Sequence, residues 1–373
     1  MGDGMRITHF VENLNRGGLE RVVIDLIGAQ REQGHTCEVI CLFERGALAA
    51  ELVDNGVPVH ACGKRSGLDF AAVARARAML HRAPPAVLHT HNAVSHYHAV
   101  FAAIGLPITR VVNTRHGMGG LRPRGRRDHL YRYSMRFTHM VATVCEAARN
   151  DLVASGIVRP DKVVSVPNGI DTDAFAPATP QAQQRLAIAL GFPEHTRLIG
   201  SVGRLNWAKD QATLIRAYAK VQKRVPESAL VLVGDGSLKE QLATLAAAEG
   251  VAARVRFLGD RDDIPELLQG FCMFASSSTT EGYSIAIMEA CAAALPTIAT
   301  RVGGNAEIVR DGINGHLVEA GDAEALACAM VAVLEDTPRA QSMGLAARDW
   351  VMRHGSLRAM ATRYAQVYGE AVP

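Results

Sequence analysis

Of the 373 residues of the chain, 48% are hydrophobic and 21% are charged, and this composition excludes a disordered chain. Because a chain of this length is too long for one ordinary hydrophobic core, we expect two globular domains. The net charge is only +3, but residues 1–168 carry 21 basic and 14 acidic side chains against 19 and 23 in the remainder, so the first part suits an anionic partner better. No apolar run approaches the roughly 18 residues that cross a bilayer, no signal segment opens the sequence, and the seven cysteines include no Cys-x-x-Cys pair, so we expect a cytoplasmic protein in a reducing compartment.

Short apolar runs alternate with longer amphipathic stretches in the first half of the chain. The short runs predict strands at residues 5–11, 35–43, 57–62, 86–91, 110–116 and 139–144. Between them, apolar residues at helical spacing predict helices at residues 19–34, 47–56 and 70–83. This alternation favours a parallel sheet with helices on both faces.

A segment rich in Pro, Asn, Gly and Asp, residues 166–182, interrupts the pattern and predicts a linker. The alternation then resumes, with strands predicted at residues 197–203, 228–236, 254–259, 272–278, 296–300 and 315–318. We therefore predict an α/β protein with two doubly wound parallel-sheet domains that face each other across a cleft. Such sheets bind ligands beyond the carboxyl ends of their strands.

Four histidines crowd the stretch HTHNAVSHYH, residues 89–98. His89 and His91 share one face of a strand and could grip an ion, whereas His96 and His98 fall about 200° apart on the next helix. No Asp or Glu occurs between residues 70 and 127, so we expect no metal here. His89 could pack against the sheet with His96 and His98 on a helix surface; alternatively, His91 points into the cleft as a hydrogen-bonding group, which we favour.

The stretch TTEGYSIAIMEACAAALPTIAT, residues 279–300, places a carboxylate beside a helix start. Glu281 lies in a loop after a predicted strand, Ser284 can cap the next helix, and Glu289 projects from its second turn. An anion at this helix start would meet free backbone N–H groups and the positive end of the helix dipole. Eight helical residues span ~12 Å, more than separates the carboxyl groups of glycosidases, so the two glutamates suit separate contacts on one extended ligand.

Cations and glycines mark further strand ends. Arg204 and Lys209, in SVGRLNWAKD, stand between a strand and a helix, where a guanidinium fork and an ammonium suit a diphosphate. Gly17 and Gly18 open the first helix, where backbone N–H groups can approach phosphate without a Cβ in the way. No G-x-G-x-x-G or Walker loop occurs, so NAD and ATP sites lack their usual signatures.

Two patterns invite over-interpretation. Asp171 and Asp173 form an Asp-x-Asp in the linker, where an Asx-type turn is expected rather than a metal site. Residues 115–127 contain five arginines, Arg115, Arg122, Arg124, Arg126 and Arg127. We expect this segment to form a loop, which is either solvated or binds an anionic acceptor or a membrane surface.

Taken together, these motifs resemble those of the retaining family 4 glycosyltransferases, which have the GT-B fold of two Rossmann-like domains. The resemblance runs along almost the whole chain. Its most specific part is the E-x7-E motif from Glu281 to Glu289, followed by EACAAALPTIAT. Five further motifs precede it along the chain, in the order GGLERVVIDLIGAQREQGH, VPNGIDTDAF, GRLNWAKD, VGDG and RFLGD. The motif GGNAEIV follows it.

The resemblance implies roles for individual residues. Arg204 and Lys209 would hold the donor diphosphate, Glu281 the donor sugar and Glu289 the ribose, and His116 would approach the sugar from the N-terminal domain. The implied catalytic set is Glu281, His116, Arg204 and Lys209. The implied donor-binding set is Gly17, Gly18, Arg204, Lys209, Gly234, Phe257, Leu258, Gly259, Glu281, Gly282, Tyr283, Ser284, Ile285 and Glu289. Acceptor contacts are expected at His91, Arg115, Arg122 and Arg124.

The resemblance also implies domain limits and an activity. Residues 1–168, with a last helix in residues 357–373, would form the acceptor-side domain, and residues 169–356 the nucleotide-sugar domain. A hexose-type sugar would pass with retention from a UDP or GDP sugar to a glycan or lipid-linked acceptor, without a metal or other cofactor. We expect this in cell-surface polysaccharide or lipopolysaccharide synthesis, in the cytoplasm or at the inner face of the membrane, with no nucleic-acid partner.

Departures from the family pattern keep alternatives open. Ser284-Ile285 stand where many relatives have Gly-Leu, and Asp210 and Ala294 stand where glycine is common. A nucleotide-sugar epimerase or phosphorylase of the same architecture remains an alternative, as do a sugar-nucleotide-binding protein without activity and a metal-dependent hydrolase that uses the histidines.

Overall fold

The structure is a computed structural model that describes residues 4–67, 69–118 and 126–369. The chain divides into two compact units, which we call unit 1 and unit 2. Unit 1 comprises Met1–Gly169 and Leu357–Pro373, and unit 2 comprises Ile170–Ser356. The last helix of the chain therefore belongs to the same unit as the first strand.

Unit 1 is built around a sheet of seven parallel strands in the order β3-β2-β1-β4-β5-β6-β7. Strands β1 to β7 span Arg6–Val11, Thr36–Cys41, Val59–Ala61, Val87–His91, Arg110–Arg115, Met140–Thr143 and Val163–Ser165. Helices α1 to α6 span Gly18–Glu32, Ala49–Asp54, Phe70–Arg82, Ala93–Ala103, Arg126–Ser134 and Glu146–Ala154, and α15 spans Leu357–Tyr368.

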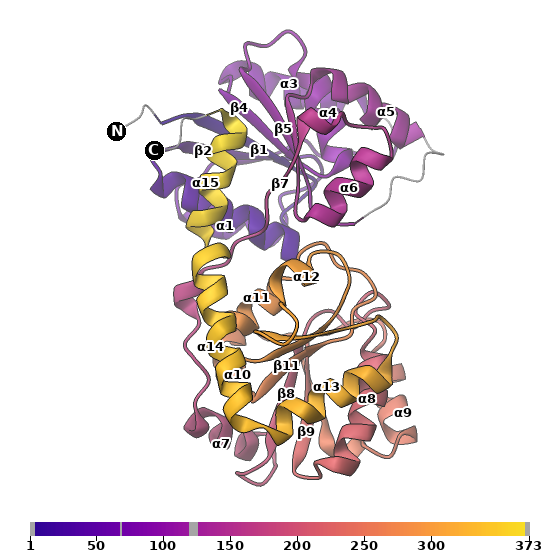
Figure 1. The fold of residues 1–373 in the computed structure, drawn as a ribbon. Helices are drawn as coiled ribbons and strands as arrows, with labels where there is room; N and C mark the ends of the chain where they lie inside the picture. Colours follow the sequence, from indigo (N-terminus) through magenta and orange to yellow (C-terminus); the bar gives the residue numbers. More distant parts are fainter. Residues whose placement is uncertain (1–3, 68, 119–125, 370–373) are drawn as a thin grey trace. The chain divides into compact units, whose positions relative to one another are not determined.

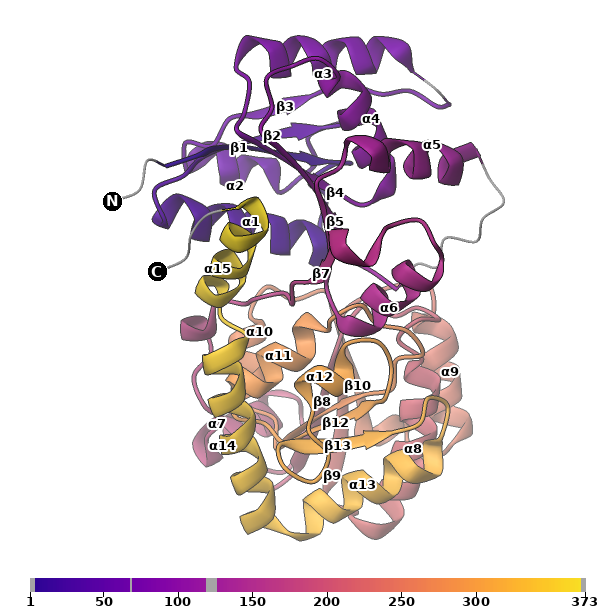
Figure 2. The ribbon, with the colours of Figure 1, turned by 45° about the horizontal axis from the view of Figure 1, so that its top comes forward.

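Helices cover both faces of the unit 1 sheet. Figures 1 and 2 show α3 and α4 on one face, and α1 and α15 side by side on the other. Because successive side chains of a strand point to opposite faces, Phe10 and Leu88 enter the apolar cluster with α3 and α4. Their neighbours His9 and His89 face α1 and α15 instead. The alternation thus gathers polar side chains under α1 and α15.

Unit 2 contains a sheet of six parallel strands in the order β10-β9-β8-β11-β12-β13. Strands β8 to β13 span Arg197–Val202, Ser228–Val233, Val255–Gly259, Met273–Ser276, Thr297–Thr300 and Gly315–Val318. Helices α7 to α14 span Pro180–Ala189, Gln211–Arg224, Lys239–Ala248, Ile264–Gln269, Ile285–Ala292, Asn305–Ile308, Ala323–Glu335 and Thr337–His354. Its main apolar core joins α8 and α13 to the central strands.

The strand order reverses at one point in each sheet, between β1 and β4 in unit 1 and between β8 and β11 in unit 2. Parallel strands end at a common edge, and sheets of this type bind ligands beyond that edge at the point of reversal. The loops that follow these four strands therefore occupy the positions where ligand contacts are expected.

The structure confirms the predicted class of two doubly wound parallel sheets, and every predicted strand is present. The pattern does not predict β7, because its three residues adjoin the Pro- and Gly-rich linker and are too few to show a period. The Arg-rich segment, predicted as a loop, becomes helical from Arg126 onward in α5. Among the described residues, no helix combines the length and apolarity needed to span a bilayer.

Candidate functional site

Arg204 and Lys209 stand in the loop that joins β8 to α8, beyond the carboxyl end of β8. The backbone N–H of Lys209 donates to the carbonyl oxygen of Asn206 at 3.2 Å. The side-chain amide of Gln211 donates to the carbonyl oxygen of Arg204 at 3.0 Å. These bonds order the loop while Arg204 remains exposed and the Lys209 side chain remains 26% exposed, so both cations are accessible.

Asp210 ends this loop with a left-handed backbone, at φ 45°. This conformation costs a non-glycine residue roughly 1–2 kcal/mol. The Asp210 carboxylate caps α8, accepting hydrogen bonds from the backbone N–H of Thr213 at 3.3 Å and from its hydroxyl at 2.7 Å. Because a helix cap contributes about 1 kcal/mol, the aspartate offsets much of its own strain and directs its charge toward the helix.

Glu281 follows β11 and meets the β8 loop through its side chain. Its Oε1 accepts a hydrogen bond from Nζ of Lys209 at 2.5 Å and one from the hydroxyl of Ser278 at 2.7 Å. The Glu281 side chain is only 10% exposed. We call Lys209, Ser278 and Glu281 the Lys209–Glu281 cluster. It joins the two strands that flank the point of reversal in unit 2.

Backbone contacts lock these two loops together. The hydroxyl of Ser277 donates to the carbonyl oxygens of Lys209, at 3.0 Å, and Asp210, at 2.7 Å. The N–H of Thr279 donates to the carbonyl oxygen of Ala208 at 2.9 Å. The positions of the charged side chains are therefore set by hydrogen bonds between the two loops as well as by their own pairing.

The start of α11 lies directly beyond Glu281. Ser284, which is 4% exposed, caps α11 by accepting from the N–H of Ile287, as predicted. Gly303, in the loop after β12, has φ +49°, and a Cβ there would lie 1.8 Å from the carbonyl oxygen of Glu281. The N–H of Gly304 donates to the carbonyl oxygen of Gly282 at 2.8 Å. Glycines thus allow the β12 loop to support the backbone that carries Glu281.

Glycine turns bring two further strand ends to the same edge. The N–H of Gly234 donates to the carbonyl oxygen of Gly259 at 2.7 Å. A Cβ on Gly234 would lie 2.3 Å from the carbonyl oxygen of Gly203, next to Arg204. The predicted base-lining residues, Phe257 to Gly259, are half-buried at the end of β10. Glu289 is half-buried on α11.

In unit 1, Gly17 and Gly18 begin α1 after β1, and no side chain caps this helix start. His116 follows β5 and is half-buried. Its Nε2 lies 2.8 Å from Nδ1 of His91, whose Nε2 lies 3.1 Å from Nδ1 of His9. Nε2 of His9 in turn lies 2.8 Å from Oε1 of Gln30, on α1.

A second branch leads from Gln30 to the C-terminal helix. The amide nitrogen of Gln30 donates to the hydroxyl of Tyr368, on α15, at 2.8 Å. That hydroxyl lies 2.7 Å from Nδ1 of His89, whose Nε2 lies 2.7 Å from the Thr114 hydroxyl. The Thr114 hydroxyl also bonds the hydroxyl of Tyr364 at 2.9 Å. We call the residues of both branches, His9, Gln30, His89, His91, Thr114, His116, Tyr364 and Tyr368, the histidine network.

Burial keeps the imidazoles of the network uncharged at neutral pH. Loss of solvation lowers the pKa of His9 to about 4 and that of His116 to about 3. It lowers the pKa values of His89 and His91 well below the ordinary histidine value, and the other histidines add to the effect. One ring nitrogen from each of His9, His89 and His91 lies within 4.8 Å of the other two, a spacing that could hold a metal ion. Each of their ring nitrogens already has a hydrogen-bonding partner, so the observed geometry is that of a hydrogen-bond network.

The histidine predictions need correction. His91 does not point into open space, because it is 1% exposed and both ring nitrogens bond to other histidines. His96 and His98 are not surface residues of α4, since their exposed fractions are 0% and 2%. His96 bonds the hydroxyls of Thr90 and Thr138 instead. The mistake arises because α4 is covered by α3 and α5, which its spacing alone does not reveal.

Of the three arginines predicted to contact the acceptor, the structure describes only Arg115. Arg115, at the end of β5, is half-buried, and its guanidinium lies 5.1 Å from the centre of the Tyr131 ring. Arg122 and Arg124 lie outside the described residues. In the linker, the Asp171 carboxylate accepts from the N–H of Asp173 at 3.1 Å, which confirms the predicted Asx-type turn.

Sequence reasoning misses Ser278, His9, Gln30, Tyr364 and Tyr368. Only His9 carries a local signal, as a polar residue within an otherwise apolar strand. Gln30 and the tyrosines are distant in sequence from the strands they contact, so no short motif joins them to the histidines.

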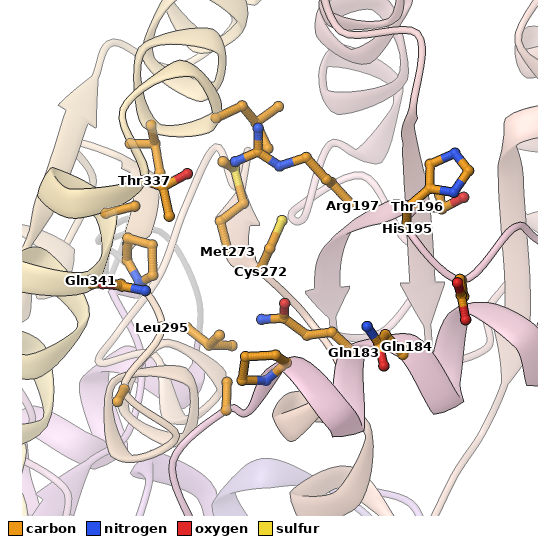
Figure 3. A pocket seen from close by; sticks show the side chains of 18 residues that line it. Gln183, Gln184, His195, Thr196, Arg197, Cys272, Met273, Leu295, Thr337 and Gln341 are labelled. Atoms are coloured by element: carbon orange, nitrogen blue, oxygen red, sulfur yellow. The ribbon is translucent and has the colours of Figure 1, made fainter.

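A cavity of 330 Å³ in unit 2 lies elsewhere, at the amino ends of β8 and β11 (Figure 3). Arg197, Cys272, Met273 and side chains of α7 and α14 line it. None of the residues predicted for the site takes part. Because parallel α/β sheets bind ligands at the opposite edge, we assign the candidate site by its chemistry rather than by this cavity.

Known families match both halves of the chain. Residues 16–174 match the model described as Glycosyltransferase Family 4, and residues 183–350 match the model described as Glycosyl transferases group 1. A putative glycosyltransferase, EpsD, from Bacillus subtilis is 32% identical over 67% of this chain and 67% of its own length. The UDP-Gal:alpha-D-GlcNAc-diphosphoundecaprenol alpha-1,3-galactosyltransferase of Escherichia coli is 29% identical over 67% of this chain and 66% of its own.

Several other curated relatives are matched over only about half of their own length. Among solved structures, Anabaena Alr3699/HepE in complex with UDP is similar in fold, with a TM-score of 0.87 and 24% identity. The superposition covers 97% of this chain and 99% of that one.

Proposed function

The chain belongs to glycosyltransferase family 4 and has the GT-B fold, and from this we propose that it transfers a hexose-type sugar from a nucleotide-diphosphate sugar to a glycan or lipid-linked acceptor. The observation that carries the proposal is the Lys209–Glu281 cluster, placed at the point of strand reversal in unit 2. Arg204 and the start of α11 lie on the same loops. The HepE structure holds UDP, and the Escherichia coli relative is named for a UDP sugar, so a UDP donor is tested first and a GDP donor second.

The cations of unit 2 suit the leaving group of this reaction. When the bond between the sugar and the diphosphate breaks, negative charge develops on the diphosphate. An ammonium has three N–H donors, and Lys209 uses one on Glu281, so others can reach a phosphate. Arg204 adds a fork of donors, and the start of α11 adds backbone N–H groups. These groups supply positive charge without a divalent metal.

Glu281 suits a role in holding the sugar. Lys209 and Ser278 both bond to its Oε1. Within residues 4–67, 69–118 and 126–369, no hydrogen bond to its second oxygen is found, and a carboxylate oxygen accepts readily from sugar hydroxyls. We assign Glu281 to binding rather than to attack on the sugar, because a carboxylate held by an ammonium is a weaker nucleophile.

Retention then follows from transfer on one face of the sugar. The bond from the anomeric carbon to the diphosphate breaks, and the acceptor oxygen bonds to that carbon on the same face. The acceptor proton passes to the departing phosphate oxygen, so no protein base is consumed. Burial lowers the pKa of His116 to about 3, so its imidazole is a weak base in this structure.

A lipid-linked acceptor at a membrane surface is supported by unit 1. The Escherichia coli relative is named for an acceptor on diphosphoundecaprenol. Residues 1–168 carry the excess of basic side chains. On α5 and beyond it, Tyr133 and Phe137 are 48% and 39% exposed, and the guanidinium of Arg136 lies 5.1 Å from the Tyr133 ring centre. Exposed aromatic rings beside cations suit the headgroup region of an anionic bilayer.

The test incubates the purified protein with UDP- and GDP-hexoses and a polyprenyl-diphosphate-linked sugar, and NMR determines the anomeric configuration of the product. We expect the configuration of the donor, with full activity after treatment with EDTA. An inverted product contradicts retention, and activity that is lost to EDTA and restored by a divalent metal contradicts metal independence. Turnover of donor alone would instead favour an epimerase or phosphorylase.

A further inference from the structure

The proton positions of the histidine network are coupled from ring to ring. A neutral imidazole has one N–H and one bare nitrogen, so a ring that donates on one side must accept on the other. Between Gln30 and His116, every ring therefore donates either toward Gln30 or toward His116. The group at the buried end decides the direction.

Gln30 is that group, and its orientation is supported by a third contact. Its carbonyl oxygen faces Nε2 of His9, and its amide nitrogen donates to Tyr368. The thiol of Cys37 lies 3.7 Å from the same carbonyl oxygen. Burial raises the pKa of Cys37 to about 12, so the thiol keeps its proton and can donate it to this oxygen. Gln30 consequently presents an acceptor to His9.

From this end the protons can be assigned in turn. His9 donates from Nε2 to Gln30 and accepts at Nδ1, and His91 donates from Nε2 to His9 and accepts at Nδ1. His116 must then donate from Nε2 to His91, which leaves its Nδ1 without a proton. In the part of the chain that the structure describes, no hydrogen bond to this Nδ1 is found.

We infer that Gln30 is a positioning residue: through His9 and His91 it holds His116 as the Nε2–H tautomer, which leaves Nδ1 of His116 as a hydrogen-bond acceptor for a hydroxyl of a sugar substrate. Since the pKa of His116 is lowered to about 3, this nitrogen accepts a hydrogen bond without taking up the proton. The identity of the ligand rests on the proposed function, whereas the tautomer of His116 does not.

The first test needs no variant at the positioning residue. Long-range ¹H–¹⁵N correlation spectra of the full chain, labelled with ¹⁵N-histidine, distinguish the two neutral tautomers of a ring. Comparison with His116→Asn identifies the His116 signals. We expect a proton on Nε2 and none on Nδ1 at neutral pH, and a proton on Nδ1 overturns the inference.

The second test removes the acceptor. Gln30→Met keeps the side-chain length but leaves His9 without a carbonyl oxygen. Because a buried N–H without a partner is disfavoured more than an under-satisfied acceptor, we expect His9 to turn its bare nitrogen toward the methionine and the chain to reverse. His116 should then carry its proton on Nδ1, and KM for the substrate whose hydroxyl meets this nitrogen, either the nucleotide sugar or the acceptor, should rise about fivefold, the effect of one neutral hydrogen bond.

Tyr364→Phe is the matched control, because it removes a buried hydroxyl from the far end of the other branch. We expect the tautomer of His116 and the KM to stay unchanged. A His116 that keeps Nε2–H in Gln30→Met, or that reverses equally in Tyr364→Phe, overturns the inference. If the protein binds no nucleotide sugar while the tautomers behave as stated, the proposed function fails and the role of Gln30 in setting the tautomer stands.

Discussion

The two units place opposite chemistries at equivalent positions of their sheets. In unit 1 the network beside the point of reversal consists of neutral imidazoles, among which His9, His89 and His91 are at most 1% exposed. In unit 2 the corresponding loops carry ions, with Lys209 26% exposed and Arg204 more so. Burial therefore separates the roles: the deep imidazoles of unit 1 are uncharged and orient their neighbours, whereas the accessible cations of unit 2 are available to a ligand.

The largest expected effect is a loss of stability in acid that is confined to unit 1. The pKa of His9 is lowered to about 4 and that of His96 to about 3, by burial in both cases. The folded state therefore binds fewer protons than the unfolded state, so stability is full above the ordinary histidine pKa of about 6.5 and falls as pH drops from there toward the folded values. At pH 5 each of these two residues lowers the free energy of unfolding by about 2 kcal/mol relative to neutral pH.

Hydrogen exchange followed by mass spectrometry, at pH 7.5 and pH 5 and corrected for intrinsic rates, compares the two units in one sample. The histidines of unit 2, His195, His316 and His354, are not buried, so unit 2 is the internal control. Protection should fall in β1, β4 and α4 and much less in unit 2. Equal losses in both units would break the contrast between them.

The next effect concerns the ions of unit 2. Lys209→Ala, Glu281→Ala and Arg204→Ala should each lower the rate of sugar transfer at least about 100-fold, or about 2.7 kcal/mol of transition-state stabilisation, because each removes a group assigned to the diphosphate or the sugar. Steady-state kinetics with a UDP or GDP sugar measures the loss.

Matched controls for these variants lie on α8, away from the carboxyl edge of the sheet. Lys220→Ala and Arg224→Ala remove exposed cations that pair with Glu324 and Glu335. Such surface pairs contribute little, so both variants should transfer sugar at the normal rate. Near-normal rates in all three site variants would falsify the assignment of the site.

The smallest effect sharpens the account of Glu281. Ser278→Ala removes one of the two hydrogen bonds to its Oε1 and leaves Lys209 in place. A neutral donor to a charged acceptor contributes about 1.5 kcal/mol, so we expect kcat/KM to fall about tenfold. Ser237→Ala, at an exposed serine, serves as the control. A loss as large as that of Glu281→Ala would mean that Ser278 itself contacts the ligand.

How far the sequence predicts this molecule depends on the range of the interactions. Apolar periodicity is local, so every strand except β7 follows from it, as do helices α1, α2 and α3, and Ser284 as a helix cap follows from the residues next to it. The pairing of Lys209 with Glu281 joins residues 72 positions apart, and only the family resemblance places both at one site. Burial of His96 depends on helices that cover α4, and the link from Gln30 to Tyr368 spans 338 positions. No local pattern contains such contacts.

A crystal structure of the protein with a bound nucleotide sugar tests the central claim most directly. The claim is that accessible cations and a helix start in unit 2 receive the departing diphosphate. The phosphate oxygens should lie within hydrogen-bonding distance of Lys209, Arg204 and the backbone N–H of Ile285. A diphosphate bound away from all three groups would contradict the account.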